Sequence, residues 1–366
     1  MKKKNVVKRN IGVCICFCYV INVVAQNVNA ESRKLGFGAE LTSEAQVANT
    51  GKFNFANLLR LQANVPFNRA LSWDISSIST YMTSKESIGG DLQTFSNVDA
   101  ENIPFALAVC GLNWEINSSN ALFLGIRNMN EDYFSSPVTS LFTNSSCGIY
   151  PTISANSQIA NYPVASVGAH YRYEKTYDSA EVDVNDALVV QASLYNGTGY
   201  NHFTGHENVF RFCPKSDGIF GIAQVEYWHN GSGYFLGGWT SPSPSDDGGL
   251  HTVIGGWAYA EQQVTDNLSL IAAYSHAVGS FVTCSNFAGL GGKFSWGKCE
   301  AGIFTDYAMF TEGAELATEL TCKMQVTPSI YIQPTFHMSS TPSASPEARR
   351  AFCVMGTLRF GWCISM

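Results

Sequence analysis

The chain has 366 residues, a formal net charge of −7 and only 14% charged residues, whereas soluble domains average about a quarter. A hydrophobic content of 45% excludes a disordered chain, because such a composition can bury a core. The negative charge, without a basic stripe beyond the first ten residues, argues against nucleic acid as a partner. The 13% aromatic residues and 32 glycines favour β-structure that does not face water in the usual way.

The amino terminus has the three parts of a secretory signal peptide. Residues 1–10 carry five basic side chains, and an apolar run follows at 11–25, IGVCICFCYVINVVA. Small-residue cleavage sites end at Ala25 and Ala30. The alternative of an uncleaved anchor is disfavoured because a helical span needs about 20 apolar residues. The sequence therefore predicts a signal peptide at 1–30, followed by one domain at 31–366 with 17 basic and 29 acidic residues.

After the leader, apolar residues alternate with polar ones over segments of 8–12 residues, the period of a half-exposed strand. The tight turns between segments carry Asn, Asp, Gly and Pro, as at 117–120, 230–233, 265–267 and 327–329. Sixteen strands are predicted, with fourteen or eighteen as alternatives, near 35–41, 53–65, 70–82, 103–115, 120–128, 164–174, 187–196, 218–228, 233–240, 252–263, 267–278, 287–296, 298–309, 313–325, 329–338 and 351–363. Longer connections fall at 83–102, 129–163, 197–217, 240–251 and 339–349.

Each predicted strand has one apolar and one polar face. In 314–324, for example, Leu316 and Leu320 share a face, while Glu315 and Glu319 lie opposite. A soluble sandwich would bury the apolar face, whereas a transmembrane barrel turns it toward lipid and lines its lumen with the polar face. The leader and the low charge favour the barrel, and closure is needed because an open sheet edge in lipid leaves backbone groups unpaired. We expect an all-β fold, a transmembrane antiparallel up-and-down β-barrel.

The alternation assigns charged side chains of both signs to the lumen, which suits a neutral solute better than a simple ion filter. Arginine forks and carboxylates can bond sugar hydroxyls, and a narrow polar constriction selects through its lining. The predicted lumen set is Glu40, Arg60, Asp74, Arg127, His170, Arg172, Glu174, Glu226, Glu300, Asp306, Glu315, Glu319, Lys323 and Arg359. The candidate pore-lining and substrate residues among them are Arg60, Arg127, His170, Arg172, Glu226, Glu315, Glu319 and Arg359. Generic solvation of the lumen is the alternative for each.

The connection 129–163 is the longest and the most aromatic, with Tyr133, Phe134, Phe142 and Tyr150. It either folds inward and narrows the pore or caps the rim.

No sequence pattern indicates a metal, a cofactor or a catalytic site. The patterns G-x-S-x-G, H-E-x-x-H and the P-loop are absent, which predicts that the chain is not an enzyme. Eight cysteines follow the leader without a C-x-x-C pair, so a zinc site is not expected. Most fit the role of small apolar residues, and Cys147 with Cys213 is the best candidate for a disulfide.

Several segments resemble the carbohydrate-selective porins of Gram-negative outer membranes. They are LGIRNMNEDYFSSP (124–137), FTNSSCGIYPTISANSQIANYPVASVGAHYRYE (142–174), GYFLGGWTS (233–241), GGWAYAEQQV (255–264), TEGAELATELTCKMQVTPSIYIQPTFHMSSTP (311–342) and GTLRFGW (356–362). The resemblance covers roughly 121–362, and it rests on the order of loose motifs. It implies a sixteen-stranded pore in the Gram-negative outer membrane with a preference for sugars, monomeric rather than oligomeric, although an oligomer is also compatible.

Two other functions fit parts of the pattern. The first is a non-transport barrel in the outer membrane, either a surface adhesin or a barrel hydrolase. The second is a soluble secreted β-protein such as a lectin. The predicted partners of the porin are small sugars as permeating solutes and the lipids of the outer membrane.

Overall fold

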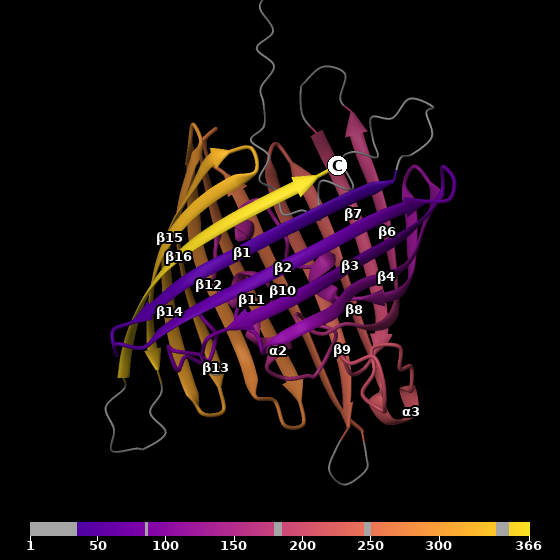
Figure 1. Cartoon of the computed structure of the whole chain (residues 1–366), viewed down its shortest axis with the longest axis horizontal. Coiled ribbons are helices and arrows are strands. Elements are labelled where there is room, and N and C mark those ends of the chain that lie inside the picture. The colour runs from indigo at the N-terminus through magenta and orange to yellow at the C-terminus, as the bar shows by residue number, and fades with distance from the viewer. Residues whose placement is uncertain (1–34, 85–86, 179–184, 245–249, 342–350) are drawn as a thin grey trace, which may run out of the picture.

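The computed structural model describes residues 35–366 apart from 85–86, 179–184, 245–249 and 342–350, so the predicted signal peptide lies outside the described residues. Sixteen antiparallel strands form one closed barrel, in which every strand pairs with its neighbours in the chain and β1 pairs with β16 (Figure 1). This confirms the predicted fold class and strand number. The strands are β1 Gly36–Ala48, β2 Phe53–Pro66, β3 Leu71–Met82, β4 Ile103–Asn117, β5 Asn120–Arg127, β6 Ser166–Asp178, β7 Asn185–Asn196, β8 Ile219–His229, β9 Ser232–Pro244, β10 Leu250–Gln263, β11 Leu268–Gly279, β12 Cys284–Trp296, β13 Cys299–Phe310, β14 Gly313–Thr327, β15 Ile330–Thr341 and β16 Ala351–Ser365.

The strand boundaries differ most from prediction at β1. The sequence predicts a strand over 35–41, but β1 continues to Ala48. Its second half, Thr42 to Gln46, has only the small residues Ser43 and Ala45 on its outer face, which makes the alternation weak. Glu44 and Gln46 are buried on the lumen side, so this half of β1 is held by side-chain contacts inside the barrel.

The predicted assignment of faces holds along the wall. Leu124 on β5 and Leu316 on β14 are each 51% exposed, on the outside, where lipid replaces water. His170 on β6 and Glu319 on β14 are buried on the inside. No helix among the described residues is long and apolar enough to cross a membrane.

The two rims of the barrel are unlike. Both described chain ends lie at one rim, where the start of β1 pairs with the end of β16. Tight connections such as 118–119, 230–231 and 297–298 close the strands at this rim. The opposite rim carries the long connections, of which 83–102 and 128–165 supply side chains buried inside the barrel.

The lumen face of β7 to β13 is largely apolar, which the simple alternation did not predict, although it also carries buried polar residues such as Gln224, Glu226 and Glu261. It carries large rings, including Trp239, Trp257 and Phe304, all buried. A glycine beside a ring gives it room: a Cβ on Gly237 would lie 2.1 Å from the ring of Trp257. Both faces of these strands are therefore mostly apolar, because much of the inner one packs against protein instead of water.

The suggested disulfide between Cys147 and Cys213 is wrong. Both are free cysteines. Cys147 is buried within the barrel in the largest apolar cluster, whereas Cys213 precedes α3 (Pro214–Asp217) in the connection between β7 and β8. Their places in different connections explain why a pairing based on loop location alone failed.

Candidate functional site

The connection 128–165 folds into the lumen and does not cap the rim. It contains the short helices η2 (Met129–Glu131), η3 (Thr139–Leu141), η4 (Ser145–Cys147) and α2 (Pro151–Ser154). Its aromatic rings pack against rings of the wall. Phe134 lies 4.8 Å from Trp257 between ring centroids, and Tyr150 stacks on Phe287 at 4.8 Å. The loop and β7–β13 thus form one apolar core inside the barrel.

Two buried glutamates of the wall bind this inward loop through its backbone. Glu319 accepts hydrogen bonds from the Thr143 N–H at 2.8 Å and the Asn144 N–H at 2.9 Å, and from both side chains. Glu261 on β10 accepts from the Val138 N–H at 3.1 Å. A carboxylate that accepts several N–H bonds is well satisfied without a cation. These acids hold the loop against the wall.

The connection 83–102 is bound in the same way. Glu315 on β14 accepts hydrogen bonds from the Leu92 N–H at 2.8 Å and the Gln93 N–H at 3.1 Å. Glu315 is fully buried. Both long loops are therefore anchored to the lumen face of one strand, β14.

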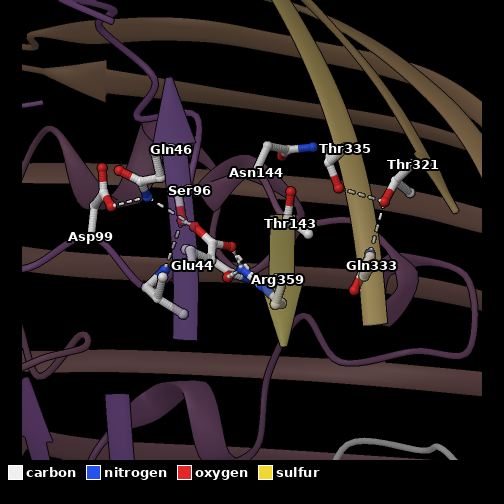
Figure 2. A network of polar contacts seen from close by, with 12 residues as sticks. Glu44, Gln46, Ser96, Asp99, Thr143, Asn144, Thr321, Gln333, Thr335 and Arg359 are labelled. Atoms are coloured by element: carbon white, nitrogen blue, oxygen red, sulfur yellow. Dashed lines mark hydrogen bonds and ion pairs between the residues drawn. The ribbon is translucent and has the colours of Figure 1, made fainter. Parts of the chain in front are cut away.

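A second set of contacts fixes the same loop to β1 and β16 (Figure 2). Arg359 donates to Glu44 at 2.6 Å and to the Asn97 side chain at 2.6 Å. The Ser96 hydroxyl donates to Glu44 at 2.6 Å. A buried acid and base at this distance are strongly coupled, and the loss of either leaves an uncompensated charge.

Asp99 lies at the edge of this network. The Gln46 amide donates to one Asp99 oxygen at 2.8 Å, while the other oxygen is buried and has no hydrogen-bond partner among the described residues. Burial, helped by the negative charges of Glu44 and Asp91, raises the pKa of Asp99 to about 7 despite the bond from Gln46. Asp99 is therefore easier to protonate than an exposed aspartate, and its protonation lowers the negative charge of the connection 83–102.

On the other side of the inward loop, its first turn carries acids that pair with arginines of the wall. Asp132 accepts two hydrogen bonds from Arg127, at 2.6 and 2.5 Å, and lies 3.4 Å from His170 Nε2. Glu131 pairs with Arg60 of β2 at 2.6 Å. Burial alone would raise the pKa of Asp132, but the charges of Arg127 and His170 and the arginine hydrogen bonds hold it below its usual range.

The lumen is divided into a packed half and a polar half. The packed half is the loop core against β7–β13. The polar half faces β1–β6, where the lumen side chains remain partly exposed. They include Arg60, Gln62, Asn64, Asp74, Asn113, Arg127, Arg172 and Glu174. Arg172 pairs with Glu174 at 2.9 Å, so basic and acidic groups alternate along this half.

The structure places the eight predicted pore residues on the inner face, in two separate groups. Arg60, Arg127, His170 and Arg172 lie along the polar half, and Glu226 is buried nearby, accepting from Gln191, Gln224 and Trp228. Glu315, Glu319 and Arg359 lie under the loops, where they are 0%, 2% and 7% exposed. Within the first group, Arg60, Arg127 and Arg172 are partly exposed to the polar space, whereas His170 and Glu226 are buried beside them. The second group binds loops.

Sequence reasoning missed five acids that shape the site. Glu131, Asp132 and Asp99 lie in loops, where no periodicity assigns a direction. Glu44 lies beyond the predicted end of its strand, although a longer reading of the alternation would have found it. Glu261 lies in a strand with two apolar faces, so alternation could not tell inside from outside. The described residues contain no group of His, Cys, Asp or Glu side chains that could hold a metal ion.

No protein-family model and no curated protein sequence matches the chain. Solved structures do match. The high-pH structure of OprB from Pseudomonas putida superposes with a TM-score of 0.69 at 14% identity, covering 90% of this chain and 93% of that one. A mutant of the Rhodobacter blastica porin gives 0.52 at 8% identity, covering 90% and 100%. The outer membrane protein OmpT of Vibrio cholerae, in its loop L8 deletion mutant, gives 0.55 at 11%, covering 90% and 99%.

The chain has the fold of outer-membrane porins. The neighbours are outer-membrane barrels, which agrees with the predicted Gram-negative outer-membrane location. At such low identity the likeness concerns the fold, and one barrel fold carries many functions.

The prediction that the chain is not an enzyme requires correction. The OmpT outer membrane protein is among the structural neighbours alongside porins, so this fold does not support the exclusion. The structure also brings together residues that motif spacing cannot relate. Ser193 Oγ lies 2.8 Å from His170 Nδ1, and His170 Nε2 lies 3.4 Å from Asp132. An argument from missing sequence motifs was therefore insufficient.

Proposed function

We propose that this chain is an outer-membrane porin through which small hydrophilic solutes diffuse, with a preference for sugars. The observation that carries the proposal is the division of the lumen. One half is closed by the inward loop, and the other is lined by partly exposed polar side chains from β1–β6. We infer that solutes pass along this polar half, opposite the inward loop.

The charge pattern of that wall favours a neutral, hydroxyl-rich solute. Arg60, Arg127 and Arg172 each pair with a neighbouring acid. Paired acids and bases still form hydrogen bonds, while their charges largely cancel. Sugar hydroxyls can therefore replace water molecules at the wall, and ions are not strongly attracted there. Arg127 also lies over the ring of Phe123, at 4.7 Å, which fixes its plane. The resemblance of the sequence to carbohydrate-selective porins supports the same preference.

We assign the roles of the predicted residues accordingly. Arg60, Arg127 and Arg172 border the path, and the buried His170 and Glu226 support that wall. Glu315, Glu319 and Arg359 hold the loops that narrow it. A monomer contains all of these groups, so the proposed path needs no second copy.

Liposome swelling tests this function. Vesicles that contain the refolded protein should swell in isosmotic glucose faster than in a disaccharide. The Arg60→Ala and Arg172→Ala variants should reduce the preference for glucose over a non-sugar solute of similar size. Glu300→Gln, a change on β13 outside the proposed path, is the matched control. Vesicles that swell no faster than protein-free ones would refute the proposal.

The contact of Ser193 with His170 supports a second candidate, a barrel hydrolase. Here the ring is turned so that Nδ1 faces the serine and Nε2 faces Asp132, and Asp132 is also held by Arg127. A fluorophosphonate probe distinguishes this candidate. Covalent labelling that is lost in Ser193→Ala supports hydrolysis, and an unlabelled protein that conducts solutes supports the porin.

A further inference from the structure

The connection between β7 and β8, residues 197–217, lies against the outside of the barrel. Its residue Val209 is fully buried and packs on Leu107, Ile126 and Ala165. Ile126 pairs with Cys110, which in turn pairs with Ile75. Paired residues of a sheet share a face, and Ile75 is exposed on the outer one. Val209 therefore covers outward-facing side chains.

The position of this loop has a reason in the wall beneath it. β5 (Asn120–Arg127) has 8 residues, whereas β4 has 15 and β6 has 13. At the loop rim β5 ends at Arg127, level with Ser166 at the start of β6, whereas β4 continues beyond Val109 to Ile103. The wall is therefore lower at β5 and β6 than at β4. Residues 197–217 cover the outer face of the wall here. In Figure 1 the connection can be found from α3, at the rim opposite the chain end labelled C.

The loop is fixed by polar contacts rather than merely resting on the wall. Tyr200 and Ala165 exchange two backbone hydrogen bonds, at 2.9 and 3.2 Å. Arg211 pairs with Asp217 at 2.9 Å, and Asn196 donates to the same carboxylate at 2.9 Å. Burial would raise the pKa of Asp217, but these hydrogen bonds lower it to about 2, so the pair stays charged at neutral pH.

This fixed loop presents three exposed rings. Phe203, Phe210 and Phe212 are 40%, 55% and 59% exposed. Phe203 stacks on the outward-facing Phe105 of β4 at 5.5 Å, and Phe210 lies 6.5 Å from Phe203. The rings are thus continuous with the outer surface of the barrel.

The same band continues over the neighbouring strands. Outward-facing aromatic residues near the loop rim of β2, β3 and β4 are Phe53, Phe55, Tyr81 and Phe105, all exposed. Outer-membrane barrels carry such rows of aromatic residues where the lipid headgroups meet the acyl chains. The loop prolongs this row across the low part of the wall, where β5 itself ends.

We propose that residues 197–217 are a membrane clasp, whose Phe203, Phe210 and Phe212 insert into the boundary between headgroups and acyl chains of the outer leaflet. The occupant of this surface is lipid, because the rings extend a surface that the barrel already turns toward lipid. The polar side chains of the same loop, such as Arg211 and Lys215, then lie at headgroup level. The clasp covers the outer face of the wall where β5 ends, and it does not depend on what the pore transports.

Photolabelling from lipid tests the proposal on the intact protein. The refolded chain is placed in vesicles of phosphatidylcholine that contain a phosphatidylcholine with a diazirine near the glycerol end of one acyl chain. After illumination, mass spectrometry maps the labelled residues. Label is expected on Phe203, Phe210 or Phe212 at a yield comparable with Phe105. The buried segment 133–150 is the internal control and should carry at least tenfold less.

A variant separates insertion from simple proximity. In Phe210→Asn with Phe212→Asn, label on 200–217 should fall at least tenfold, while label on Phe352 of β16 is unchanged. Absence of label on 200–217 in the wild type, with Phe105 labelled, would overturn the proposal. Cross-links between Lys215 side chains of two copies, without lipid label, would also overturn it and identify a second copy as the occupant.

Discussion

The anchoring of the inward loop by Glu319 gives the sharpest prediction. Glu319→Ala removes the acceptor of two backbone N–H groups and two side-chain donors at Thr143 and Asn144. An unpaired buried donor costs about 1–3 kcal/mol, so the two backbone groups alone weaken docking by about 2–6 kcal/mol. Because a factor of ten corresponds to about 1.4 kcal/mol, the undocked fraction should rise at least about 30-fold.

Cys147 provides a natural probe of undocking. It is buried, and its N–H donates to the Asn144 side chain at 2.9 Å. Burial raises the pKa of the Cys147 thiol well above its usual range, and thiolate is the reactive form. In the docked state, Cys147 should therefore react very slowly with a maleimide.

The assay is the rate of Cys147 modification in the folded protein, followed by mass spectrometry of its peptide. Glu319→Ala should accelerate it at least about 30-fold, in line with local opening as the limiting step. Glu174→Ala, a partly exposed lumen acid on β6 that pairs with Arg172, should change it less than about twofold. An unchanged rate in Glu319→Ala, with folding verified by gel mobility, would show that the glutamate does not hold the loop.

Three other predictions concern the wall, the charge of the docked loop and selectivity. Leu124→Arg should impair assembly in a folding gel-shift assay, since arginine on the lipid face costs about 2–4 kcal/mol at the bilayer midplane, whereas Asn113→Ser, at a partly exposed lumen position of β4, should assemble; equal effects would contradict the assigned faces. Asp99 has its pKa raised from 3.8 to about 7, so docking of the connection 83–102 should weaken by up to about 4 kcal/mol as pH rises from about 4 to 7 and stay level above. Asp99→Asn should therefore reduce the fall in the thermal midpoint between pH 5 and pH 8, and an unaltered fall would contradict this prediction. Arg127→Ala leaves Asp132 unopposed and should shift the reversal potential in a KCl gradient toward cation preference, and an unchanged potential would place both residues away from the path.

The barrel was predictable because period two is a property of the strand itself. Leu124 and Arg127 fall on opposite faces of β5 whatever the rest of the chain does, and the sequence alone assigns them correctly. The same rule places His170 and Glu319 inside. What the rule cannot supply is the identity of the group that each inward side chain meets.

The missing information lies in the loops. Asp132 comes five residues after Arg127, but only the inward fold of the loop turns it back onto that arginine. Glu319 was expected to face water, and instead it accepts hydrogen bonds from Thr143 and Asn144, far away in the sequence. Such contacts depend on the path of an aperiodic segment through the barrel, and that path is set by ring packing such as Phe134 on Trp257.

The most direct test of the central claim, a pore along the polar half of the lumen, is conductance across a planar bilayer. The refolded wild-type protein should open stable single channels, and added glucose should reduce the ion current in a saturable way. Glu319→Ala should enlarge the conductance and weaken the block, because the loop no longer narrows the path. A folded, inserted protein that conducts no ions would contradict the account.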